Sequence, residues 1–244
     1  METKFEIVPV PTRILTHHDD IVEAIVEYGG DKIGPDDVVC VAESVVAITQ
    51  GGAKRSEDFK PGLLAKVLCR LFPSKGSISG WHSMQALIDA EGGMRVLIAV
   101  ICGFAAKCVG VSGVFYRMAG EQARLIDDVT GTMPPYDKHI VYGPHNPSKV
   151  AEEITSGTGA FGAAVADVND LKRSCVLGVS KGVNADEVAQ ILIDNPFGNG
   201  SQKTPVVVIK INICADRLPQ SFVILEMIEV IHFCFQDSLE SSIG

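Results

Sequence analysis

Short apolar runs alternate with longer segments of helical spacing along residues 5–211 of the chain. Apolar or alternating runs rich in Val, Ile and Ala predict strands at residues 5–10, 38–42, 140–142, 163–167, 175–179 and 205–211. Apolar positions that recur at helical spacing predict helices at residues 16–28, 61–72, 81–90, 94–107, 148–155 and 184–193. This order of elements predicts an α+β fold with mixed strands and flanking helices.

Residues 113–137 interrupt this pattern because they are too polar for an ordinary core segment. They combine two basic residues, a pair of acids and a Thr-Gly-Thr turn closed by Pro-Pro, and the charged residues of interest are Arg117, Arg124, Asp127 and Asp128. Carboxylates beside a glycine-containing turn can hold a hard metal ion against phosphate oxygens. An ordinary helix end with capping acids explains the same residues equally well.

Asp167 closes a predicted buried strand, and Asp170 follows it closely. If the fold brings Asp127 or Asp128 against Asp167, one or two divalent cations would offset the repulsion between the converging carboxylates. Four basic residues could then meet phosphate groups, namely Arg117, Arg124, Lys172 and Arg173. The alternative is that Asp167 and Asp170 only end a strand and form a turn.

A second candidate site follows the strand predicted at residues 38–42, where Glu43 and Ser44 come directly after the last apolar residue. Polar side chains at the end of a buried strand often form sites in α/β proteins. The alternative is that Ser44 caps a short helix that Gly51 and Gly52 terminate. Neither a G-x-G-x-x-G pattern nor a phosphate-loop motif is present in this segment.

Composition narrows the class of protein. The formal net charge of −9 argues against nucleic-acid binding, which requires a basic face, but leaves room for a local basic pocket. None of the seven cysteines forms a C-x-x-C pair, and several lie within apolar runs, so buried free thiols in the reducing cytoplasm explain them better than disulfides or zinc.

Two segments raise the question of membrane contact. The apolar run at residues 96–106 lies between Arg95 and Lys107 and is shorter than the roughly 20 residues that cross a bilayer, so we expect a buried helix and no membrane span. The N-terminus lacks the pattern of a signal peptide. Residues 212–244 contain a second apolar stretch that could pack as a helix or form a poorly integrated tail.

Several segments, in the same order, resemble those of the coenzyme F420-0:γ-glutamyl ligase family. The quoted family patterns are loose, but their order and spacing agree with this chain. The correspondences are residues 5–10 with the opening strand, 36–52 with the strand together with its "VVSKAEGR" segment, 118–121 and the following acids with "NAG-x-D", 143–151 with "LPxDPDxSA", 165–173 with "SDTFGRPWR", and 205–209 with "IPVVVVR".

The resemblance implies a GTP-dependent acid–amino-acid ligase that works as a homodimer with Mg²⁺ or Mn²⁺. It would activate a carboxylate acceptor as an acyl phosphate and join it to L-glutamate through a γ-glutamyl-type amide. Asp167 matches the family's metal-binding aspartate, and Asp127 and Asp128 match its upstream acid less closely. The segment with Ser44 and Thr49 would line the nucleotide site. With these roles, the basic residues that could meet phosphate are assigned as follows: Lys172 and Arg173 join Asp167 as expected catalytic residues, and Arg117 and Arg124 are expected to contact the nucleotide.

The chain also departs from the family pattern. Ile48 stands where the family typically has lysine, residues 171–173 replace the "GRPWR" run, and a helical insert occupies residues 61–110. We therefore interpret residues 1–211 as a divergent ligase-like domain and residues 212–244 as a tail outside the resemblance. Two alternatives are a non-catalytic binding protein that retains the fold, and a membrane-peripheral protein that uses residues 94–106 and the tail.

Overall fold

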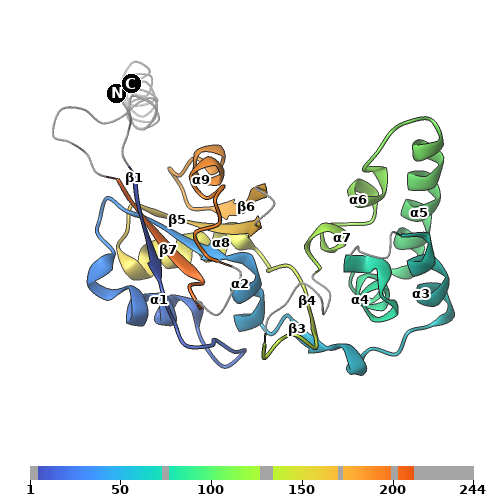
Figure 1. Cartoon of the computed structure of the whole chain (residues 1–244), viewed down its shortest axis with the longest axis horizontal. Helices are drawn as coiled ribbons and strands as arrows, with labels where there is room; N and C mark the ends of the chain where they lie inside the picture. The colour runs from blue at the N-terminus through green and yellow to red at the C-terminus, as the bar shows by residue number, and fades with distance from the viewer. Residues whose placement is uncertain (1–4, 73–76, 127–133, 170–172, 199–202, 212–244) are drawn as a thin grey trace, which may run out of the picture.

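A computed structural model describes residues 5–72, 77–126, 134–169, 173–198 and 203–211, without the side chains of Asn169 and Arg173 (Figure 1). Its centre is a five-stranded sheet in the order β1-β7-β2-β5-β6. The strands are β1 (Phe5–Val10), β7 (Val206–Ile211), β2 (Val38–Ala42), β5 (Gly162–Asn169) and β6 (Arg173–Val179). Only the β2–β5 pair is parallel among these neighbours, so the sheet is mixed, as the sequence predicts.

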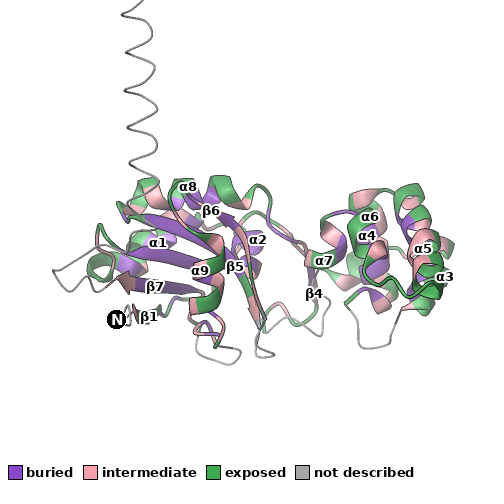
Figure 2. Ribbon diagram, turned by 90° about the horizontal axis from the view of Figure 1, so that it is seen from above, coloured by how far each residue is buried: buried purple, intermediate pink, exposed green. Residues whose placement is uncertain are grey.

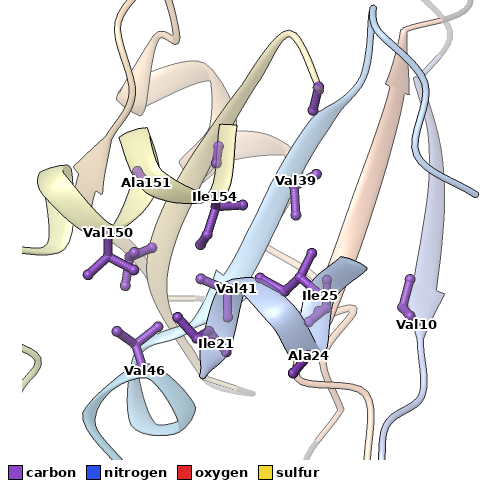
Figure 3. Packing of buried hydrophobic residues seen from close by; sticks show 14 of the residues in the cluster. Val10, Ile21, Ala24, Ile25, Val39, Val41, Val46, Val150, Ala151 and Ile154 are labelled. Atoms are coloured by element: carbon purple, nitrogen blue, oxygen red, sulfur yellow. The ribbon is translucent and has the colours of Figure 1, made fainter. Parts of the chain in front are cut away.

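Both faces of the sheet are covered, which explains the continuous apolar runs of its central strands. Val39 and Val41 point to the face that α1 (Ile21–Gly29) and α8 (Pro147–Thr158) cover, where Ile25 and Ile154 pack against them (Figure 3). The neighbouring residues of β2 point to the opposite face, which packs against α9 (Ala185–Ile191). Figure 2 shows the strands largely buried between these layers.

The short helix α2 (Glu43–Thr49) follows β2 without a connecting loop and packs on the face of α1 and α8. Its N-cap is Ala42, and no side chain caps it, so the alternative that Ser44 acts as the cap is wrong. By contrast, Asp20 caps α1, and its carboxylate accepts bonds from the amides of Val22 (2.8 Å) and Glu23 (3.0 Å).

A helical lobe lies beside the sheet and has a core of its own (Figure 1). Its helices are α3 (Leu63–Leu68), α4 (Trp81–Glu91), α5 (Gly93–Cys108), α6 (Val114–Met118) and α7 (Gln122–Leu125). Met84, Leu87 and Val96 are fully buried in this core. A two-stranded ribbon of β3 (Ala53–Arg55) and β4 (His139–Val141) joins the lobe to the sheet.

All six predicted strands are present, but two expectations about burial are wrong. Residues 96–106 form the predicted helix α5, yet only its inner side is buried; Ile98, Ile101 and Phe104 are exposed. Cys108 and Cys175 are also exposed, while Cys40 and Cys69 are buried as expected. The helix predicted at residues 61–72 is shorter, because α3 ends in a 3₁₀ turn.

Two further expectations concern membrane-spanning helices and residues 212–244. Within the described residues, every helix is too short or too polar to traverse a bilayer. Residues 212–244, which the sequence marks as a separate tail, lie outside the described residues.

Candidate functional site

One edge of the sheet gathers several strand ends. β1 and β2 both run antiparallel to β7, and β5 runs parallel to β2, so the carboxyl ends of β1, β2 and β5 meet there with the start of β7. Val10 and Val41 both pair with Val206, and Ala42 pairs with Ala166. The carboxyl ends of β1, β2 and β5 therefore lie at the same height in the sheet. Such an edge is where open sheets commonly bind ligands.

A pocket of about 210 Å³ opens at this edge, and we call it the sheet-edge pocket. It lies between the segment that follows β1, the start of α2, residues 134–136 and the segment that precedes β7. Apolar side chains such as Ile48 and Phe197 form part of its wall. The polar and charged residues that line it are Thr12, Arg13, Ser44, Tyr136, Lys203 and Thr204.

Arg13 and Lys203 give the pocket a positive character. Arg13 is held by Asp19, whose Oδ2 accepts a bond of 2.9 Å from Nη1 while Oδ1 contacts Nη2. Asp19 also accepts a 2.7 Å bond from the amide of Thr16. The guanidinium and then this amide hold the pKa of the Asp19 carboxyl well below its usual range. The Lys203 ammonium has no ion pair with any residue that the structure describes.

The three serine and threonine hydroxyl groups of the sheet-edge pocket are not equivalent. Thr12 Oγ1 donates to the carbonyl of Arg13 (2.7 Å), and Thr204 Oγ1 donates to the carbonyl of Phe197. Among the described residues, the Ser44 hydroxyl has no such bond, so it remains available to a ligand. Thr49 lies at the far end of α2, where its hydroxyl donates to the carbonyl of Val46 (2.9 Å), and it does not line the pocket.

Asp167 lies at the same edge of the sheet, one residue beyond the pairing of Ala42 with Ala166. Its neighbours Ala163 and Val165 belong to the core cluster that α2 and α8 cover, so alternation places Asp167 on the face of α2. The residue is exposed, yet partial desolvation raises the pKa of its carboxyl. The strand register places Asp167 near the sheet-edge pocket, but Asp167 is not one of the residues that line this pocket.

The described residues alone do not form a metal site. No group of three His, Cys, Asp or Glu side chains converges within this part of the chain. The acids expected to join Asp167, namely Asp127 and Asp128, lie outside the described residues, as does Lys172. The backbone of Arg173 begins β6 opposite Asn169, but its side chain is not described. A metal held by Asp167 would therefore need ligands from those segments.

Arg117 and Arg124 lie in the helical lobe, on α6 and α7. They line a pocket of about 440 Å³ together with Tyr116 and Ile126. The pocket is distinct from the sheet-edge pocket, so the described structure does not bring these arginines to Ser44. In the sequence, Asp127 and Asp128 follow Ile126 directly.

A further pocket of about 520 Å³ adjoins the sheet-edge pocket, since Pro135 lines both; we call it the ribbon pocket. Its charged lining residues are Arg55, Glu57, Asp137 and Lys138. His139 also lines it, and the Nδ1 atom of this residue is buried without a hydrogen-bond partner among the described residues.

Sequence reasoning found Ser44 but missed Arg13 and Lys203. Each lies just outside a strand, Arg13 after β1 and Lys203 before β7. The available signal was the rule that also selected Ser44, namely that polar residues beyond strand ends deserve attention. The structure adds that Lys203 has a φ of 51°, in the left-handed region that non-glycine residues seldom adopt.

Comparison with known proteins relates the chain to a protein family. No curated protein matches the chain. A family model described as F420-0:Gamma-glutamyl ligase matches residues 9–168, which is more than half of the chain. The matched region contains Arg13, Ser44 and Asp167, and it also spans the helical lobe. The five-stranded mixed sheet with flanking helices agrees with that family, and the chain therefore belongs to the F420-0:γ-glutamyl ligase family.

Proposed function

We propose that the chain is a nucleotide- and divalent-metal-dependent ligase that joins an acceptor carboxylate to the amino group of L-glutamate or a similar amino acid. Residues 1–211 would form the ligase domain. Membership of the γ-glutamyl ligase family supports the reaction class. GTP as the nucleotide and Mg²⁺ or Mn²⁺ as the metal follow from the resemblance in sequence.

The observation that carries this proposal is the cationic sheet-edge pocket beside Asp167. Each expected substrate is an anion: the nucleotide through its phosphates, and the amino acid and acceptor through their carboxylates. Arg13 offers a planar guanidinium, Lys203 an ammonium and Ser44 an unengaged hydroxyl. Such groups bind carboxylate and phosphate oxygens through charge-assisted hydrogen bonds.

Pocket size indicates how the substrates would be arranged. Pockets for drug-sized ligands occupy about 300–1,000 Å³, so the sheet-edge pocket, at about 210 Å³, fits an amino acid or a phosphate group better than a whole nucleotide. The adjoining ribbon pocket, at about 520 Å³, offers the additional room that a second substrate requires. Two neighbouring pockets suit a reaction that joins two bound molecules.

The proposed reaction has two steps. An oxygen of the acceptor carboxylate attacks the γ-phosphorus, the nucleoside diphosphate leaves, and an acyl phosphate forms. The amino nitrogen of glutamate then attacks the acyl carbon, inorganic phosphate leaves, and the nitrogen loses a proton to give the amide. Lys172 and Arg173 would neutralise charge on the transferred phosphoryl group. A metal bound by Asp167 with Asp127 or Asp128 would supply Lewis-acid charge stabilisation.

A ligation assay tests this proposal. The full chain would be incubated with Mg²⁺ or Mn²⁺, GTP or ATP, L-glutamate and a panel of carboxylate acceptors, and products would be identified by mass. We expect a product with the mass of acceptor plus glutamate minus water. Asp167→Asn should reduce turnover at least about a hundredfold, the usual scale for a lost electrostatic contact. Asp31→Asn, at an exposed acid in the 3₁₀ turn that follows α1, is the matched control and should leave turnover unchanged.

A non-catalytic binding protein is the second candidate, and one observation favours it. Ile48 is only 7% exposed and lines the sheet-edge pocket with an apolar side chain, where the resembling family typically carries lysine. Under this alternative, calorimetry would show nucleotide binding, while no acceptor in the panel would give a product. Product formation that Asp167→Asn abolishes would exclude it.

A further inference from the structure

Burial divides the sheet-edge pocket into an apolar inner wall and a charged mouth. The inner wall includes Leu15, Ile48 and Phe197, which are only 5%, 7% and 7% exposed. Arg13 and Lys203 line the mouth, where both residues are exposed. Apolar groups gain free energy when they leave water, whereas charged groups lose it unless they are paired. A ligand of this pocket therefore needs an apolar body for the inner wall and a polar head for the mouth.

The charge of the mouth selects the polar head. Arg13 is already paired with Asp19, whose negative charge offsets that of the guanidinium. Among the described residues no acid lines the pocket, so the Lys203 ammonium adds one uncompensated positive charge. A single carboxylate balances that charge. A phosphate monoester, which carries about −1.5 to −2 at pH 7, or a second carboxylate would leave negative charge without a partner beside an apolar wall.

An α-amino acid suits the sheet-edge pocket less well than a plain carboxylate, although size alone would admit it. Its ammonium group would find no carboxylate among the described lining residues. The ribbon pocket differs, because Glu57 and Asp137 line it together with Arg55 and Lys138. Charges of both signs suit glutamate, which carries an ammonium group as well as carboxylates. The two pockets therefore favour different substrates of the proposed reaction.

We propose that the sheet-edge pocket binds the acceptor, and that the acceptor is a small monocarboxylate with an apolar body. The name acceptor rests on the proposed ligase function. The pocket volume of about 210 Å³ equals that of about seven water molecules at roughly 30 Å³ each. Pentanoate, a five-carbon chain with one carboxylate, matches this size. Its carboxylate lies at the mouth, and because Pro135 is exposed and lines both pockets, the mouth adjoins the ribbon pocket.

Calorimetry with three ligands of equal chain length tests the head group. Pentanoate is compared with glutarate, which adds a second carboxylate, and with norvaline, which adds an ammonium group. The full chain, without nucleotide, should bind pentanoate at least about tenfold more tightly than either. Chain length tests the body: from acetate to pentanoate, affinity should rise about fourfold per methylene group. The gain should stop beyond hexanoate, because the inner wall is then covered.

Substitution of Lys203 tests the charge at the mouth. Lys203→Ala should weaken pentanoate binding at least about tenfold, because a hydrogen bond to a charged group is lost. Lys203→Arg should restore most of the affinity, since it keeps the positive charge. Lys32→Ala is the matched control, because Lys32 is an exposed lysine in the 3₁₀ turn after α1, and it should leave binding unchanged.

A reversal of preference tests the inner wall. Ile48→Lys places a second cation there and should make the pocket prefer glutarate to pentanoate at least about tenfold. Ile48→Leu, which keeps the wall apolar, should retain the preference for pentanoate. Val45→Lys is a second variant in case Ile48→Lys does not fold, since Val45 lies three residues earlier on α2, lines the same pocket and is only half-buried. It should shift the preference in the same direction.

Two results in the binding experiments would overturn the proposal: glutarate or norvaline binding the wild-type chain as tightly as pentanoate, and pentanoate binding that Lys203→Ala leaves unchanged. The ligation assay separates this proposal from the proposed function. Selective pentanoate binding without any product would refute the ligase reaction and keep the selectivity of the pocket. Products from dicarboxylate acceptors but from no monocarboxylate would keep the ligase reaction and refute the acceptor assigned to the pocket.

Discussion

The ion pair between Arg13 and Asp19 fixes one wall of the sheet-edge pocket. Asp19 accepts bonds from the Arg13 guanidinium and from the amide of Thr16, and so it anchors Arg13, which is one of the residues that line the pocket. The same contacts keep the Asp19 carboxyl ionised to low pH. A substrate anion would therefore meet an Arg13 that is already oriented, which reduces the entropy lost on binding.

Replacing Arg13 with alanine should change how stability depends on pH. The pKa of Asp19 is lower in the folded state than in the unfolded state, so its contribution to stability is present above about pH 4 and is lost as the pH falls below that. The Arg13→Ala variant should lose part of this acid dependence. Urea unfolding between pH 2 and 6 would measure it. Arg55→Ala, which breaks the exposed pair with Glu57, should leave the curve unchanged.

Thiol reactivity should separate the cysteines by burial. Desolvation raises the pKa of the Cys40 thiol well above its usual range, so little thiolate is available there. A brief pulse of a thiol reagent, read by peptide mass spectrometry, should label Cys108 and Cys175 at least tenfold faster than Cys40 and Cys69. Equal labelling of all four in the native protein would contradict the packing of β2.

At the residue scale, sequence could identify part of the candidate site. Ser44 was predictable because it directly follows a buried strand, and Asp167 because it ends one. Arg13 and Lys203 also lie beyond predicted strand ends, but sequence could not join them to Ser44, because only the placement of β1 and β7 beside β2 brings these distant residues together. Strand order is set by long-range packing, which local patterns do not encode.

At the scale of elements, close approach between α8 and β6 holds the sheet against its helices. Gly178 lies in β6 directly under the start of α8, where a Cβ atom would run into the backbone of Pro147 and Ser148. Pro147 is the first residue of α8, and its fixed φ suits that position. Glycine is required here by the available space, since neither backbone segment can move without displacing a whole element.

Gly178→Ala should therefore destabilise the protein by about 1–3 kcal/mol, the usual cost of overpacking. Gly62→Ala is the matched control, because the nearest atom to its added Cβ would be Gln85 Oε1 at an ordinary 3.6 Å, and we expect a change within about 0.5 kcal/mol. Urea unfolding of the two variants and the wild type would measure both. Equal stability of the two variants would contradict the described packing.

Element types were predictable from sequence, but the environment of each helix face was not. The continuous apolar runs of β2 and β7 identified both strands, because a strand that is covered on both faces has apolar residues at successive positions. The apolar run at 96–106 predicted a helix correctly and its burial incorrectly, because α5 is apolar on two sides and the described residues cover only one of them. Periodicity identifies an apolar face but not what covers it.

At the scale of the molecule, the predicted site residues are divided between two bodies. Ser44 and Asp167 belong to one edge of the sheet, whereas Arg117 and Arg124 line a pocket of the helical lobe. The order of the loose sequence patterns along the chain indicated the ligase family, and the family model confirms this resemblance. Sequence order alone could not show that a whole lobe with its own core separates these groups.

The most direct test of the account follows an oxygen atom through the reaction. The acceptor carboxylate would be labelled with ¹⁸O and incubated with the full chain, nucleotide, metal and L-glutamate, and the released inorganic phosphate would be analysed by mass spectrometry. An acyl-phosphate ligase transfers one ¹⁸O atom to each phosphate as the amide forms, and this is the result we expect. Release of phosphate without ¹⁸O, or nucleotide binding without any amide product, would contradict the proposed ligase reaction.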